Sequence, residues 1–415
     1  MRRTIFYIMA LVVLISGCVD KPEGAVSDDL QVINLEHSSL KTVSLDSIVA
    51  NVRFVRLETN DECLIEKYDD IQVFGDKIFV VSKSGIQEAI FIFDLEGRFL
   101  GKVDALGRGP GEYRNLMAYF INTKDETVGV IDFTSRLNVY DYGGNYLFSR
   151  QFRSFEAGES AFWFHDLHYF TVDEMTPFFE ESEGLSEFNA IIVYDHSLEP
   201  YTQTFALKRN LFAPYVESPR VRPFVATEEE LFFLHRFGDR IYKVDKGELE
   251  PIYHLDFGKH KNPDIEETIA MMNNDLRGAV VNYLIPNSLQ HPGETGFALT
   301  KKYIWFQTAV GGQLYQILHK PEKEKSIRVE LTTTVADRNL TNIRPEMYRS
   351  YQEGFYGYIG AEELLFLYEY GNYHDQHSLD GILSPVNVPG IDSLDPQDNA
   401  ILLFFEIRSD VFDHL

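Results

Sequence analysis

The sequence predicts an all-β fold, a single β-propeller of six blades with four strands each, and two observations support this prediction. An apolar run followed by a turn recurs about every 50 residues, and a period of this length is typical of propeller blades. Two further short strand patterns precede the first copies, which gives four strands per repeat. The four clearest copies each end in Asp and are residues 90–94, 137–141, 191–195 and 241–245.

The first two repeats show how each blade is predicted. Strand patterns over residues 71–74 and 77–81 precede the first copy, and patterns over 116–121 and 127–131 precede the second. After each copy, Asp and Gly residues lead into another strand. Asp and Gly tolerate the backbone angles of tight turns, so this order predicts a β-hairpin.

Two later copies complete the count, at residues 314–318 and 401–405, although neither ends in Asp. An insertion displaces the fifth copy. Residues 264–284 lie between Pro263 and Pro286 and begin with acidic residues, which predicts a short helix between blades four and five. A loop with three prolines lengthens the last blade.

The sequence also predicts how the ring closes. The last blade lacks an outermost strand, whereas residues 52–57, near the start of the chain, form a spare strand pattern with clean alternation. Pairing this strand with the last blade would close the ring and remove exposed sheet edges. We therefore expect six blades, with seven as the alternative.

The amino terminus resembles a processing signal. Residues 1–17 hold two arginines and an apolar stretch too short to span a bilayer, and small residues precede Cys18. This pattern resembles a bacterial lipobox and predicts a lipoprotein signal peptide that is cleaved before Cys18. Lipid on Cys18 would then hold the protein to a membrane. We expect residues 18–40 to be a tether and residues 41–415 to be a single propeller domain.

The composition limits the function. The chain has 64 acidic and 38 basic residues, a net charge of −26, and no run of Lys or Arg, which argues against nucleic-acid binding. Only two cysteines are present, so neither a disulfide scaffold nor a cysteine-rich zinc site is expected. No metal and no cofactor are predicted.

A glycine-rich motif carries a resemblance to a known family. Residues 107–113 have the sequence Gly-Arg-Gly-Pro-Gly-Glu-Tyr, and an earlier Leu-Glu-Thr at residues 57–59 fits the same pattern. In these motifs the chain resembles the six-bladed β-propeller lipoproteins common in gut Bacteroidetes. The resemblance implies the propeller fold and a location in the cell envelope, anchored by lipid and at the outer membrane. It implies no established chemistry.

The same motif supplies the first candidate binding residues, Arg108, Glu112 and Tyr113. It lacks the Gly-Lys-Ser/Thr ending of a phosphate-binding loop. Its glycines are expected to serve the tight connection between two blades. Since such connections often face a ligand, Arg108 and Glu112 are candidate ligand-binding residues, with a structural ion pair or turn as the alternative.

A second set of candidates lies in loops at equivalent positions of blades two and four. These loops are expected to open on one rim of the ring, where their charged side chains would bind an anionic or polar ligand such as an acidic sugar. The alternative is a solvated loop stabilised by pairs of Arg and Asp. The candidates are Asp132, Arg136, His235, Arg236 and Arg240.

Two functions from different classes remain open. The first is an envelope-anchored binding or protein-interaction module for a ligand such as a glycan or a peptide, since no catalytic signature is present. The alternative is a carbohydrate-active enzyme, a lyase or hydrolase, with its site in the central funnel. Propellers support both functions, so the fold alone does not decide.

Overall fold

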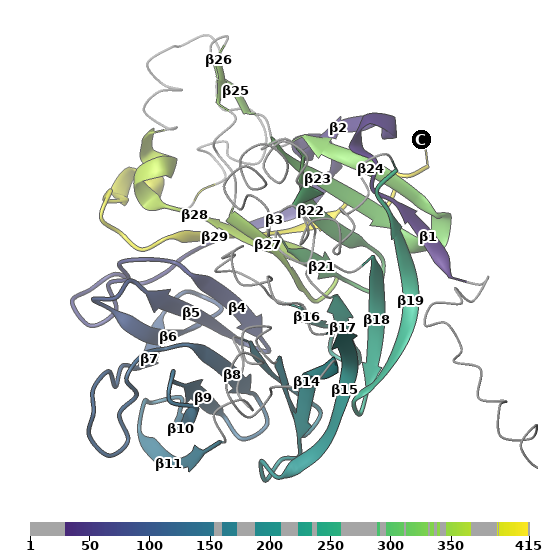
Figure 1. Cartoon of the computed structure of the whole chain (residues 1–415). Coiled ribbons are helices and arrows are strands. Elements are labelled where there is room, and N and C mark those ends of the chain that lie inside the picture. The colour runs from purple at the N-terminus through teal and green to yellow at the C-terminus, as the bar shows by residue number, and fades with distance from the viewer. Residues whose placement is uncertain are drawn as a thin grey trace, which may run out of the picture.

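The computed structural model describes residues 30–152, 160–171, 187–208, 223–234, 239–258, 289–290, 296–310, 313–330, 333–335, 338–340, 346–366, 388 and 390–413. Its strands form six sheets around a common axis (Figure 1). The predicted six-bladed propeller is confirmed over the alternative of seven blades. The expected signal peptide, residues 1–17, and the helix expected at residues 264–284 lie outside the described residues.

Blades one to three each contain four antiparallel strands. Blade one is β4 (Asp70–Phe74), β5 (Lys77–Lys83), β6 (Glu88–Asp94) and β7 (Phe99–Val103). Blade two is β8 (Ala118–Asn122), β9 (Thr127–Ile131), β10 (Arg136–Asp141) and β11 (Tyr146–Gln151). Blade three is β12 (Ala161–Phe164), β13 (Leu167–Thr171), β14 (Glu187–Tyr194) and β15 (Pro200–Lys208).

Blades four and five each gain an outer strand from the start of the chain. Blade four is β16 (Phe224–Ala226), β17 (Leu231–Leu234), β18 (Arg240–Asp245) and β19 (Glu248–Asp256), with β1 (Gln31–Asn34) added in parallel to β19. Blade five is β20 (Leu289–Gln290), β21 (Phe297–Leu299), β22 (Ile304–Val310), β23 (Gln313–Lys320) and β24 (Lys325–Glu330), with β2 (Thr42–Ser44) parallel to β24.

The position of β1 differs from the expected tether at residues 18–40. Ile33 and Leu35 are buried in the core between blades four and five, so this part of the segment belongs to the ring. The apolar residues are too few to give a strand signal in the sequence. Their burial explains why the segment nevertheless adds to the sheet.

Ring closure follows the prediction. β3 (Val49–Arg56) pairs antiparallel with β29 (Ile401–Ile407) and completes blade six, whose inner strands are β27 (Glu346–Tyr351) and β28 (Gly354–Ile359). The register sets Arg56 opposite Ile401 and Phe54 opposite Leu403. A strand near the start of the described chain and its last strand therefore share one sheet.

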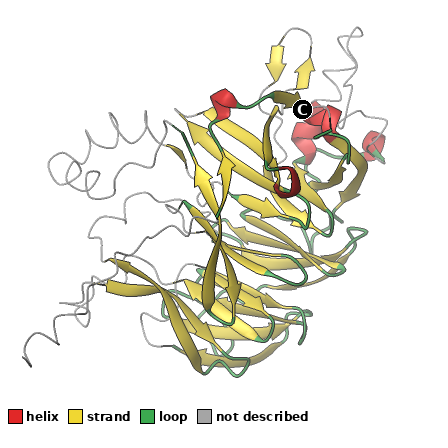
Figure 2. Ribbon diagram, turned by 90° about the vertical axis from the view of Figure 1, so that its right-hand side faces the viewer, coloured by secondary structure: helices red, strands yellow, loops and turns green. Residues whose placement is uncertain are grey.

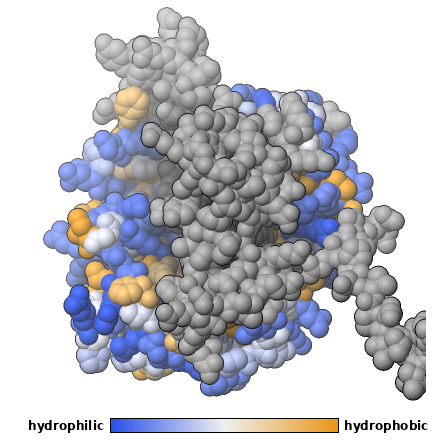
Figure 3. All heavy atoms as spheres, viewed as in Figure 1, coloured by the Kyte–Doolittle hydropathy of each residue, from blue (hydrophilic) through white to orange (hydrophobic). Residues whose placement is uncertain are grey.

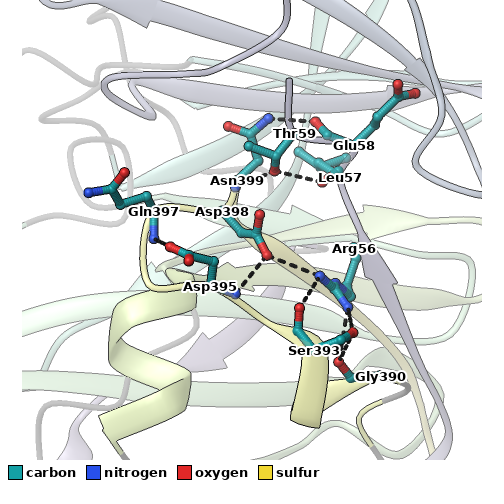
Figure 4. A network of polar contacts seen from close by, with 10 residues as sticks. All are labelled: Arg56, Leu57, Glu58, Thr59, Gly390, Ser393, Asp395, Gln397, Asp398 and Asn399. Carbon is teal, nitrogen blue, oxygen red and sulfur yellow. Dashed lines mark hydrogen bonds and ion pairs between the residues drawn. The ribbon is translucent and has the colours of Figure 1, made fainter. Parts of the chain in front are cut away.

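A polar network fastens this closure (Figure 4). Arg56 forms an ion pair with Asp398 at 3.0 Å and donates hydrogen bonds to Gly390 O and to Ser393 Oγ. Asn399, which is 2% exposed, links residues 390–400 to the segment that follows β3. Its backbone N–H donates to Thr59 Oγ1 at 2.8 Å. We call residues 56–68 together with residues 390–400 the clasp.

The recurring Asp of the sequence repeat has a clear structural role. Asp94 Oδ1 accepts hydrogen bonds from the backbone N–H groups of Glu96 and Arg98, and Asp141 Oδ1 accepts one from Asn145. Each carboxylate closes the turn into the outermost strand of its blade, as Asp side chains do in turns. The predicted hairpins are thus confirmed.

The ring has two distinct faces. In blades one and two, the connections 84–87 and 132–135 lie on the same face of the ring as the segments that link successive blades. Hydrogen bonds join each connection to such a segment: the Phe133 N–H donates to Asn115 Oδ1, and Gln87 Nε2 donates to Leu64 O. We call this the loop face. Short described turns gather on the opposite side, at the right in Figure 2.

The described helical segments are short. They are η1 (His37–Ser39), α2 (Leu45–Ile48), η6 (Pro321–Lys323), η8 (Ile391–Ser393) and residues 361–366, and a separate hairpin is formed by β25 (Thr333–Val335) and β26 (Arg338–Leu340). Within the described ranges, no helix combines the length and apolar character needed to cross a bilayer.

Candidate functional site

The glycine-rich motif forms a tight loop between blades one and two. Glu112 Oε2 accepts a hydrogen bond from the Gly109 N–H at 2.6 Å. A Cβ at Gly107 would lie 2.0 Å from that same carboxylate oxygen, so a larger residue there would displace the Glu112 side chain from its present position. The carboxylate of Glu112 thus takes the place that an external anion would occupy in a phosphate loop. Its role in the structure is to hold the loop.

Tyr113 anchors the glycine-rich loop to the core of the ring. Its side chain is fully buried, and its hydroxyl donates a hydrogen bond to the Glu88 carbonyl. Burial also raises the pKa of Tyr113, so the phenol stays protonated. A side chain without exposed surface does not contact a ligand in this conformation. Tyr113 therefore supports the neighbouring side chains instead.

The cations of this loop have a different environment. Arg108 and Arg114 are exposed, and neither forms an ion pair with a described residue. The guanidinium of Arg114 lies 5.8 Å from the ring centre of Phe133, which is 60% exposed. The Arg114 cation beside this exposed ring can bind an anionic ligand and stack on it. Arg108 lies in the same loop. We call Arg108, Arg114 and Phe133 the arginine cluster.

The candidates in blade two have separate roles. Asp132 is 1% exposed, and its carboxylate accepts hydrogen bonds from the backbone N–H groups of Thr134 and Arg114. It shapes the loop that carries Phe133. Arg136 is half-buried, and its Nη2 donates to Ser149 Oγ at 3.1 Å, so it faces the outermost strand of the blade.

The candidates in blade four are not next to these residues. Arg240 begins β18, two blades away, where its Nε lies 3.8 Å from Asp239 Oδ1. His235 and Arg236 lie outside the described residues. Arg108, Glu112 and Tyr113 thus share one loop, Asp132 is joined to that loop through the Arg114 N–H, and Arg136 and Arg240 lie apart from it.

A second polar cluster lies near the ring axis and was not predicted from the sequence. Asp70 in β4 forms an ion pair with Arg349 in β27 at 2.7 Å. Gln72 Nε2 donates to Asp70 Oδ2 at 2.9 Å, and the Tyr119 hydroxyl also donates to Asp70. These four side chains come from the innermost strands of blades one, two and six. We call them the axial cluster.

Strand geometry explains why this cluster lies at the axis. Ile71 and Val73 pack against blade six, and side chains alternate along a strand, so Asp70 and Gln72 face blade two. Arg349 projects from blade six. Its guanidinium must pass the inner edge of β4 to reach Asp70, and this inner edge borders the axis.

Aromatic rings pack beyond the axial cluster, at the other end of β4. The ring centres of Phe74 and Phe162 are 6.1 Å apart, and those of Phe162 and Phe224 are also 6.1 Å apart. These three rings join blades one, three and four. Since β4 starts at the loop face, the charged cluster is on the loop-face side and the aromatic rings are on the turn side.

The axial cluster is poorly suited to acid–base catalysis. Burial and the neighbouring Asp70 carboxylate raise the pKa of Tyr119 well above its ordinary value. A tyrosine acting as a general base needs the opposite shift. One signal of the cluster was present in the sequence, because Asp70 and Gln72 place polar groups at alternate positions of an otherwise apolar strand. Their partner Arg349 is too distant in sequence to be found by spacing.

The fold and these two clusters define a six-bladed propeller with a polar cluster near its axis. The chain belongs to a family described as a domain of unknown function, DUF4934, whose model matches residues 30–406. No curated protein matches the chain in sequence.

A solved structure supports the same fold. A Bacteroides fragilis protein described as exported has 17% identity and a TM-score of 0.69, over 92% of this chain and 100% of that one. BamB from Moraxella catarrhalis has 11% identity and a TM-score of 0.35, over 75% and 74%. PorZ, a surface component of the type-IX secretion system of Porphyromonas gingivalis, has 11% and 0.32, over 72% and 30%. The last two scores are too low to support any argument.

Proposed function

We propose that the protein is a lipid-anchored propeller of the bacterial envelope that binds an acidic ligand, such as an acidic glycan, through the arginine cluster. The observation that carries this proposal is the pair Arg108 and Arg114. In a chain with a net charge of −26, both are exposed and without a carboxylate partner among the described residues. Nearby carboxylates are already engaged, since Glu112 and Asp132 bind backbone N–H groups.

Two further points support the proposal. The location is supported by the signal-like segment before Cys18 and by the similarity to a protein described as exported. Binding is favoured over catalysis because the axial cluster has a single carboxylate, Asp70, among its described side chains, whereas glycoside hydrolysis generally needs a pair. The raised pKa of Tyr119 also favours binding over catalysis, because it makes this tyrosine a poor general base.

Replacing both arginines tests the binding site. We expect the purified full-length protein to bind uronic-acid or sulfated glycans on an array, and Arg108→Ala with Arg114→Ala to weaken this binding at least about tenfold. Wild-type binding should also fall when salt is raised, because exposed charges are screened. Arg98→Ala is the matched control, since Arg98 is an exposed arginine of blade one already paired with Asp94. Binding that survives the double substitution would contradict the proposal.

The anchor is tested separately. Cys18→Ala should release the protein from the membrane fraction and abolish incorporation of labelled fatty acid, because the thiol is the expected site of lipid attachment. Cys63→Ala is the control, since Cys63 is buried and its Sγ donates to Glu58 O. Unchanged membrane association of the Cys18→Ala protein would contradict lipid anchoring and leave the binding proposal intact.

A further inference from the structure

The outer strand of blade two, β11, is exposed in an unusual way. Tyr146, Leu147 and Phe148 are consecutive, and they are 44%, 48% and 47% exposed. On the face shown in Figure 3, by contrast, the described surface is mainly hydrophilic, with small separate hydrophobic patches. Among the described residues, no fifth strand pairs with β11. An uncovered edge with this composition can accept another strand.

In four of the other blades, the outermost strand of the repeat is covered or carries a feature that opposes strand addition. β19 and β24 are covered by β1 and β2. β7 carries Lys102, and β15 begins with Pro200 and bends at Phe205, whose φ is 64°. Lysine, proline and irregular backbone are common means of blocking strand addition.

A bulge does not distinguish β11, and it does not prevent pairing. Leu147 is the extra residue of a bulge that recurs in blade one at Leu100 and in blade four at Ile252. β19 has this bulge and still pairs with β1 over Tyr253–Asp256. The equivalent stretch of β11 is residues 148–151, because Phe148 pairs with Val139 as Tyr253 pairs with Ile241.

The neighbouring blade would also accommodate an added strand. In blade four, Gln31 of β1 donates a hydrogen bond from Nε2 to Pro321 O, in the turn of the next blade. The corresponding turn beside β11 is residues 195–199. It already touches β11, because Arg150 donates to Ser197 O. Blade two therefore has the same two parts that hold β1 in blade four: an outer strand, and beside it a turn of the next blade.

The charge of this edge indicates which partner fits. Residues 142–155 contain no acidic side chain, although 64 of the 415 residues of the chain are acidic. Arg136 donates to Ser149 Oγ within the edge and has no ion-pair partner among the described residues. Arg150 is paired with Glu199. Arg136 is thus the cation left for a ligand.

We propose that β11 is a docking site for an extended acidic peptide segment of a partner protein, which adds to blade two as a fifth strand. Its backbone would pair with residues 148–151, its apolar side chains would cover Tyr146 and Phe148, and its carboxylates would approach Arg136. This is strand addition, in which the backbone supplies affinity and the side chains supply specificity. The site is distinct from the arginine cluster.

A synthetic peptide tests this proposal. The probe is a labelled eight-residue peptide of alternating Glu and Val, whose binding to the full-length protein is measured by fluorescence anisotropy. We expect Phe148→Glu to weaken binding at least about tenfold, since it removes apolar contact and adds a repelling charge. Ser149→Pro, which removes a backbone N–H in the edge, should have a similar effect. Leu100→Glu on the edge of blade one is the matched control, with 50% exposure.

Other results would overturn the proposal. These are no binding to the wild-type protein, equal binding of a Lys–Val peptide, or an equal loss in the Leu100→Glu protein. A dimer seen by sedimentation and lost in the Phe148→Glu protein would assign the edge to a second copy of the chain instead. Arg114→Ala should leave peptide binding unchanged, so failure of the arginine cluster and failure of this site are distinguishable.

Discussion

Asn399→Ala should lower the free energy of unfolding by about 3–5 kcal/mol, because one buried amide holds the clasp together. Asn399 Nδ2 donates to Glu58 O at 2.7 Å and to Cys63 O at 2.8 Å. Its Oδ1 accepts from the Ile65 N–H at 3.0 Å and from the Tyr68 hydroxyl at 3.1 Å. Alanine would leave these four groups without this partner in a region that water reaches poorly.

The matched control for this substitution is Gln397→Ala. Gln397 is exposed in the same loop, and Figure 4 shows that it is tied to the network by its backbone N–H, which donates to Asp395 Oδ1. Its replacement should change stability by less than about 0.5 kcal/mol. Both variants are compared with the wild type by denaturant unfolding. Equal stability of the two variants would show that the clasp does not limit unfolding.

Ring closure and blade order were predictable because both depend on local patterns. Alternation of apolar and other residues over 52–57 predicts a strand. Because no outer strand follows residues 401–405, the last blade is where that strand is expected to pair. The pairing of β3 with β29 confirms both. The turns were predictable for the same reason, since an Asp side chain closes its own turn within a few residues.

The axial cluster and the added strands were not predictable in this way. Asp70 and Arg349 meet only because six blades bring β4 and β27 together, and no spacing rule links them. β1 has one buried apolar side chain, Ile33, and buried Leu35 follows it. Two apolar residues are too few for a periodic pattern. Of the candidate site residues, Arg108 is exposed, whereas Tyr113 is buried because the loop needs an anchor.

Breaking the axial ion pair should have the other large effect on stability. Asp70→Ala is expected to lower the free energy of unfolding by about 3 kcal/mol, because it leaves the Arg349 guanidinium in the ring interior without its carboxylate. Asp70 is 1% exposed, and the Arg349 side chain is 22% exposed. The residual exposure of Arg349 lets water reach part of the guanidinium, which keeps the expected loss at the lower end for a broken buried pair.

Replacing both partners separates the charge from the packing. Asp70→Leu with Arg349→Met removes both charges and keeps similar volumes, so much of the stability lost in Asp70→Ala should return. Tyr119→Phe in the double variant removes the hydroxyl that donates to Asp70, which avoids a buried unpaired donor. The single, double and triple variants are measured by denaturant unfolding.

The double variant also decides what the ion pair is for. A buried ion pair contributes little net stability compared with apolar residues of the same volume, so stability alone does not explain one at the axis. If the double variant is stable and glycan binding on the array is unchanged, the pair serves to orient the inner strands of blades one and six. If it is stable and binding is lost, the ligand reaches from the arginine cluster to the axis. A double variant as unstable as Asp70→Ala would show that packing around Gln72 and Tyr119, and not the isolated charge, sets the effect.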